Sequence, residues 1–216
     1  MKIRMINDLQ DSIDAEMAWR KRELSAILAT VKGSRNFAKD TAIRAAIALL
    51  YAHWEGAIKN LATYYLEYVS ALKLPYGELK PNFLAISLKS SLDSFSESNK
   101  SAIHTKIVTE IINSDSVRSA IPTEGIIKTG ANLNSAIFAQ IMATIGLDTS
   151  RYEGDYVLID QVLLAKRNMI AHGERVEYLD LDESRYCEIH EKIRTLMMLF
   201  ADQISNAASL KQYLKE

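Results

Sequence analysis

Residues 36–74 constrain the fold of this chain more than any other segment. The segment holds no proline and a single glycine, Gly56. Apolar side chains recur along it on more than one face of a helix, as Ile47, Trp54 and Leu61 illustrate. A long helix that is apolar on several faces is usually surrounded by other helices. We therefore expect a helical bundle in which this segment is the central helix.

The rest of the chain predicts further helices around this one. Apolar residues spaced three and four apart predict helices at residues 6–31, 82–95, 98–113, 134–145, 155–172 and 182–214. Asn134 and Asp182 are expected N-caps, and Gly146 and Gly173 are expected helix ends. Residues 114–133 lack this periodicity, so we expect an irregular excursion with a short strand at 126–128.

The chain contains only 8 glycines and 3 prolines in 216 residues, which favours long helices over sheets and loops. The expected architecture is therefore all-α, with four long helices and an insert of shorter ones at about residues 75–150. We expect residues 1–216 to form a single domain.

Charge and cysteine content narrow the functional classes. The net charge is −1, so any contact with nucleic acid has to come from a local basic patch. The single cysteine, Cys187, excludes an intrachain disulfide framework and a cysteine-rich zinc site. No uncharged apolar run approaches the length of a membrane span or a signal peptide. We expect a soluble, cytoplasmic protein without membrane contact.

The common catalytic and metal-binding motifs are absent from the sequence. There is no glycine-rich phosphate loop, no His-Glu-x-x-His motif and no Ser-His-Asp signature. Cys187 and His190 form half a zinc site at most, and such a pair is more typical of a structural surface. We therefore expect no metal and no cofactor.

Two Arg-x4-His pairs remain, and their spacing alone does not decide between them. Arg185 and His190 lie early in a long charged helix, where a solvated face is expected. Arg167 and His172 instead end an otherwise apolar helix just before Gly173. The carbonyl groups of a helix C-terminus favour a protonated imidazole. The context therefore favours the Arg167 pair as the candidate site.

A family resemblance strengthens this choice. The sequence resembles the bacterial defence-associated HEPN nucleases of the RiboL-PSP type over nearly its whole length. The blocks that carry the likeness are LLYAHWEGAIKNLATYYLEYV (49–69), NLNS (132–135) and LLAKRNMIAHGE (163–174). The Arg-Asn-x-x-x-His sequence followed by glycine is the most specific part. The resemblance thus implies a HEPN-type bundle.

The resemblance also implies a metal-independent endoribonuclease in which Arg167 and His172 are catalytic and Asn168 is the polar residue that follows the arginine. Lys166 and Arg175 are candidate contacts to the RNA backbone. The positions of Arg167 and His172 on a regular helix differ by about 140°, so they need not converge within one chain. HEPN nucleases are built as dimers, and a homodimer is expected here. The expected products are 2′,3′-cyclic phosphate and 5′-hydroxyl ends.

Other interpretations stay open at this stage. The chain could be a catalytically silent HEPN-like module that binds RNA, a nucleotide or a protein, or a plain interaction scaffold in a defence complex. A defence or toxin–antitoxin nuclease would need a regulator such as an antitoxin, and transfer RNA would suit it as a substrate. An acidic partner upstream of the arginine could be Asp160, while His53 and Glu55 could line the site or form a structural network.

Overall fold

The computed structural model describes residues 3–97, 99–174 and 181–215. Three long helices dominate it: α1 (Ile6–Gly33), α2 (Phe37–Leu72) and α8 (Glu183–Ser209). α2 packs against α1, α8, α6 and α7, which is why its sequence is apolar on several faces. The described residues contain no β-strand beyond isolated bridges, so the prediction of an all-α fold with a central helix at 36–74 is confirmed.

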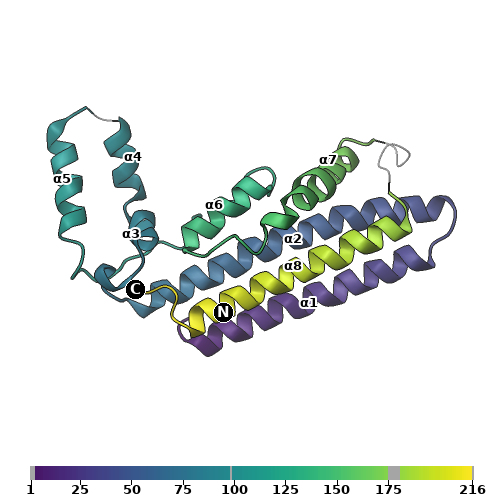
Figure 1. The fold of residues 1–216 in the computed structure, drawn as a ribbon, viewed down its shortest axis with the longest axis horizontal. Coiled ribbons are helices and arrows are strands. Elements are labelled where there is room, and N and C mark those ends of the chain that lie inside the picture. Colours follow the sequence, from purple (N-terminus) through teal and green to yellow (C-terminus); the bar gives the residue numbers. More distant parts are fainter. Residues whose placement is uncertain (1–2, 98, 175–180, 216) are drawn as a thin grey trace.

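The helix expected at residues 155–172 is not one regular α-helix. A short 3-10 turn, η2 (Glu153–Asp155), leads into a π-helical segment, η3 (Leu158–Leu164), which continues into α7 (Ala165–Ala171). η3, α7 and α6 (Ser135–Ile145) lie along one side of α2, while α1 lies along the opposite side (Figure 1). No described helix is both apolar enough and long enough to span a bilayer.

The predicted insert forms a projecting arm. After a 3-10 turn, η1 (Tyr76–Glu78), the chain forms α3 (Pro81–Ser87), α4 (Lys89–Glu97) and α5 (Ser101–Ile112). α4 and α5 pack against each other and extend away from the bundle (Figure 1). The helix expected at 82–95 is thus two helices that meet at Leu88. The strand expected at 126–128 is wrong: these residues form turns and bends beside α2.

Helix ends follow the sequence signals closely. The side chain of Asn134 accepts a hydrogen bond from the Ile137 amide at 2.8 Å, and Asp182 accepts one from the Arg185 amide at 2.7 Å. Such N-caps satisfy amides that have no partner within the helix. Gly146 ends α6 with a φ of 72°, a left-handed conformation that favours glycine.

A buried polar network fixes the register of α1 against α2. Arg20 is 3% exposed, and its guanidinium lies 2.5 Å from Glu16 and 3.2 Å from Nδ1 of His53. Since arginine can only donate, Nδ1 of His53 must accept, which leaves the Nε2 proton to bond Glu23 at 2.9 Å. Burial, followed by the charge of Arg20, lowers the pKa of His53. The network therefore holds a neutral imidazole.

Candidate functional site

The C-terminal end of α7 presents His172 to solvent. His172 is exposed and follows the last helical residue. The next residue, Gly173, has a φ of 80° and donates to the Ile170 carbonyl at 3.1 Å, while the Glu174 amide donates to the Met169 carbonyl at 3.0 Å. These two bonds form a Schellman motif, in which glycine accommodates the left-handed turn. The prediction that the helix ends at Gly173 is confirmed.

The π-helical segment sets the direction of the side chains that follow it. Within η3 the backbone hydrogen bonds lengthen, so that the Ala165 amide bonds the carbonyl of Asp160, five residues earlier. π-helical turns are rare and occur frequently at functional sites. Because the helix is locally wider, residues of α7 do not lie where a regular α-helix from Leu158 would place them.

Arg167 lies against α2. Its guanidinium carbon is 4.1 Å from the centroid of the Tyr51 ring, a distance typical of a cation–π contact. Arg167 is half-buried, and its Nε has no hydrogen-bond partner among the described residues. Buried donors in native proteins are nearly always satisfied. Other buried polar atoms share this property, but at Arg167 it concerns a permanent positive charge, five residues before an exposed histidine.

Tyr51 is held in place by a hydrogen bond from the 129–133 segment. Tyr51 is 3% exposed, and its hydroxyl accepts a hydrogen bond from the Leu133 amide at 2.6 Å. Burial raises the pKa of Tyr51, so the hydroxyl stays protonated at neutral pH. One turn further along α2, Glu55 accepts a hydrogen bond from the Thr129 hydroxyl at 2.6 Å. Two hydrogen bonds, at Tyr51 and at Glu55, therefore attach this part of α2 to the 129–133 segment.

The NLNS block supplies this attachment. The Asn132 side-chain oxygen is buried without a partner in the described structure, and Leu133 bonds Tyr51. Asn134 caps α6, and Ser135 donates to Asp160 through its amide at 2.7 Å and its hydroxyl at 2.5 Å. Asp160 thus binds the start of α6 and contributes to the site by holding η3 in place.

One face of α2 runs beneath the whole site. Arg44, Tyr51, Glu55 and Lys59 are spaced by seven, four and four residues, which places them on one side of the helix. Arg44 at one end donates to the backbone carbonyl of Glu174, two residues after His172. We refer to these four residues as the α2 ridge. Sequence reasoning missed Arg44, although its spacing from Tyr51 and Glu55 was a signal that could have been used.

The other residues that the sequence suggested for the site lie in different environments. Lys166 and Asn168 are half-buried on α7, and the Asn168 carbonyl accepts the amide of His172 at 3.0 Å. Arg175 lies outside the described residues. His53 faces α1 from the side of α2 opposite to Tyr51, within the network described above. Glu55, in contrast, lies beside Tyr51 and joins the site.

In the folded chain, the two residues of the second Arg-x4-His pair have separate environments. Arg185 is exposed and pairs with Glu188 at 2.8 Å. His190 is 3% exposed, and its Nε2 lies 3.2 Å from the Leu24 carbonyl, to which it donates. This pair therefore has structural roles. Within the described residues, no group of three or more His, Cys, Asp or Glu side chains is arranged to hold a metal ion.

Comparisons with known proteins place the whole site in a family context. The family model described as RiboL-PSP-HEPN matches residues 15–206, which includes α2 with its ridge, α7, and most of α1 and α8. Comparisons with curated proteins and with solved structures give no match.

Proposed function

The chain belongs to the RiboL-PSP-HEPN family, and from this premise we propose that it is a metal-independent endoribonuclease with Arg167 and His172 as its catalytic pair. Family membership is consistent with a ribonuclease and with RNA as the substrate. The observation that supports the proposal most is the state of Arg167. Its guanidinium rests on Tyr51 at 4.1 Å, and its Nε has no partner among the described residues.

Arg167 and His172 have complementary chemistry for cleaving a phosphodiester. Arginine stays charged and offers a planar set of donors to two phosphate oxygens, which stabilises the charge that develops on phosphorus. Histidine titrates near neutral pH and can accept or donate a proton. In the proposed reaction the ribose 2′-oxygen loses its proton and bonds to the adjacent phosphorus. The 5′-oxygen leaves with a proton, which gives a 2′,3′-cyclic phosphate and a 5′-hydroxyl.

One imidazole cannot serve both the attacking and the leaving oxygen of an in-line displacement. We therefore infer a homodimer in which two copies of α7 face each other and each supplies Arg167 and His172. The exposure of His172 leaves it accessible to such a partner. Asn168 is the polar residue of the same site, and Lys166 and Arg175 contact the RNA backbone. Unpaired loops, such as those of transfer RNA, suit a small cleft that needs splayed bases.

Cleavage of RNA in excess chelator tests this proposal. The wild-type protein is expected to cut, and sequencing of the new ends should show 5′-hydroxyl groups. His172→Ala and Arg167→Ala are each expected to lose at least about 100-fold in rate, the usual contribution of one such group. Arg185→Ala and His104→Ala are matched controls, because Arg185 lies on α8 and His104 on the projecting arm (Figure 1). Loss of wild-type activity on chelation alone would contradict the metal-independent mechanism.

Mixing the wild-type protein with the inactive His172→Ala variant tests the shared cleft. After subunit exchange, the heterodimer holds both arginines but only one histidine. If both imidazoles act on one phosphodiester, only wild-type homodimers cleave, so the cleavage rate per wild-type protomer is expected to fall as the variant is added. A rate per wild-type protomer that the variant leaves unchanged would contradict a composite site. Toxicity on expression that His172→Ala relieves would support a defence or toxin–antitoxin role under the control of an antitoxin or another regulator.

A further inference from the structure

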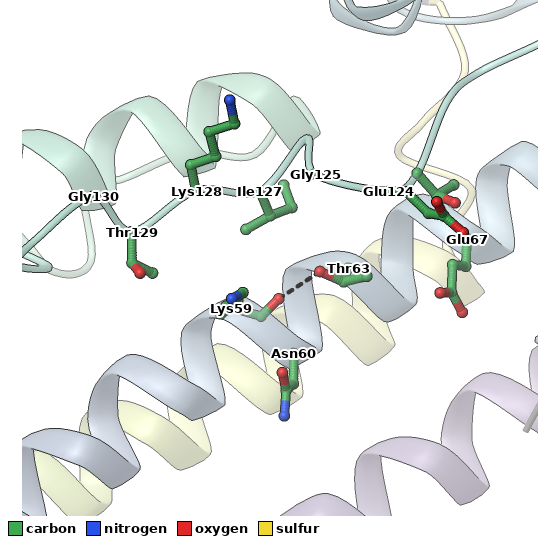
Figure 2. A pocket seen from close by; sticks show the side chains of 11 residues that line it. Lys59, Asn60, Thr63, Glu67, Glu124, Gly125, Ile127, Lys128, Thr129 and Gly130 are labelled. Carbon is green, nitrogen blue, oxygen red and sulfur yellow. Dashed lines mark hydrogen bonds between the residues drawn. The ribbon is translucent and has the colours of Figure 1, made fainter.

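A groove of about 580 Å³ continues from the site along α2. Its walls are α2 on one side and the segment 123–130 on the other, as Figure 2 shows. Side chains from α2 include Lys59, Thr63 and Glu67. The volume falls within the range of small-molecule sites and is large enough for one nucleotide. Neither Arg167 nor His172 lines this groove.

The groove is joined to the catalytic site by direct contacts. Thr129 lines the groove and donates to Glu55, the residue beside Tyr51. Lys59, one turn beyond Glu55, is the last residue of the α2 ridge and also a lining residue. From Tyr51 to Lys59 the helix rises about 12 Å. A strand of RNA whose phosphate sits on Arg167 therefore reaches the groove with a neighbouring nucleotide.

Charge divides the groove into two ends. Lys59 and Lys128 are exposed, and neither forms an ion pair in the described part of the chain. Lys128 points away from α2 in Figure 2, so its flexible side chain has to turn toward Lys59 for both to contact one phosphate. Glu67 and Glu124 lie together at the end away from Lys59 (Figure 2). Glu67 is half-buried, and burial raises its pKa. The end next to the catalytic site thus suits a phosphate, while the far end offers hydrogen-bond acceptors from carboxylates.

We propose that this groove binds a guanine nucleotide of the substrate RNA, with its phosphate on Lys59 and Lys128 and its base against Glu67 and Glu124. An ionised carboxylate only accepts hydrogen bonds. Guanine presents two adjacent donors, N1–H and the N2 amino group, on its Watson–Crick edge, which match the two oxygens of one carboxylate. Adenine and cytosine place a ring acceptor beside their amino group, and uracil flanks its N3–H with carbonyls. Single-stranded RNA exposes this edge.

This inference rests on the proposed ribonuclease function, but its test does not need activity. Binding is measured by fluorescence anisotropy with the His172→Ala protein and short single-stranded RNAs that differ only by guanine or adenine at one position. The guanine RNA is expected to bind about tenfold more tightly, the usual discrimination of one good bidentate contact. Glu67→Gln combined with Glu124→Gln should abolish this preference while leaving the adenine RNA bound as before.

The lysines are tested by the salt dependence of binding. Lys59→Ala combined with Lys128→Ala is expected to weaken both RNAs and to reduce the slope of log affinity against log salt by about 1.4, the value for two lost phosphate contacts on a single strand. Lys21→Ala combined with Arg22→Ala is the matched control, because both residues are exposed on α1, away from the groove. The control should keep the wild-type slope.

Each outcome decides one of the two proposals. If the wild-type chain cleaves RNA but the lysine and glutamate variants bind both RNAs like their control, the groove proposal is overturned and the nuclease proposal stands. If the wild type fails to cleave while guanine-dependent binding is seen and is lost in the variants, the groove proposal stands without the nuclease. A protein that binds neither RNA overturns the groove proposal, and the cleavage assay by itself decides the nuclease proposal.

Discussion

The hydroxyl of Tyr51 offers a sharp test of how the site is held. This group accepts a hydrogen bond from the Leu133 amide at 2.6 Å, and both residues are almost completely buried. Tyr51→Phe removes the acceptor and keeps the ring beneath Arg167. The amide of Leu133 then stays buried without a partner, which costs about 1–3 kcal/mol. For a domain of this size the melting temperature should fall by about 2–12 °C.

Urea denaturation followed by far-ultraviolet circular dichroism measures this loss. The Phe variant is expected to unfold at a lower urea concentration with an unchanged slope, because the surface exposed on unfolding is nearly the same. Its cleavage rate should stay near that of the wild type, since the ring still supports the guanidinium. A Phe variant that unfolds at the wild-type midpoint would refute the argument that the Leu133 amide depends on Tyr51.

Tyr51→Leu separates the ring from the hydroxyl. It removes the same hydrogen bond and also the cation–π contact to Arg167, which contributes about 0.5–2 kcal/mol. If that contact positions the guanidinium in the transition state, kcat/KM should fall about tenfold relative to the Phe variant. Equal activities of the two variants would show that the ring does not position Arg167.

Other predictions concern the supporting network and the second motif. Gly56→Ala places a Cβ 2.6 Å from the guanidinium of buried Arg20, so we expect a loss of about 1–3 kcal/mol in unfolding free energy. The folded-state pKa of His53 lies below its usual 6.5, so as the pH falls the unfolded chain takes up a proton first. Stability measured by urea titration should be fully present above about pH 6.5 and fall below it, and His53→Asn should lessen this fall. Arg185→Ala should leave the rate of RNA cleavage unchanged.

Distinct results would contradict these expectations. A Gly56→Ala protein as stable as the wild type would mean that moving Arg20 costs no more than the roughly 1 kcal/mol that alanine gains over glycine inside a helix. A His53→Asn protein with the full wild-type pH dependence would assign that dependence to other groups, such as buried His190, whose pKa is also lowered by burial. A cleavage defect in Arg185→Ala would indicate that the second Arg-x4-His pair contributes to cleavage.

Much of the fold could be predicted because helix periodicity and capping are local properties. The N-caps Asn134 and Asp182 and the stops Gly146 and Gly173 depend on residues within one turn, so the sequence specifies them directly. The errors arose where local signals were weak. The strand expected at 126–128 has apolar residues but no partner strand, and its segment packs against α2 as an irregular wall of the groove.

The candidate site was predictable only in part. Arg167 and His172 stand out by sequence because a polar pair ends an apolar helix and matches a family motif. The residues that surround them come from α2 and the 129–133 segment, and nothing in the spacing of Tyr51, Glu55 and Thr129 along the chain reveals that they meet. Such contacts depend on how helices pack, which is a long-range property.

The sequence by itself therefore determined where the long helices lie, which glycines end helices, and which charged pair merits a functional test. The tertiary structure decided that Arg167 rests on Tyr51, that His53 faces the other side of α2, and that Asp160 holds the start of α6. The physical reason is one of range. Backbone hydrogen bonding and capping act within a few residues, whereas the partner of a buried charge is set by the packing of elements far apart in the chain.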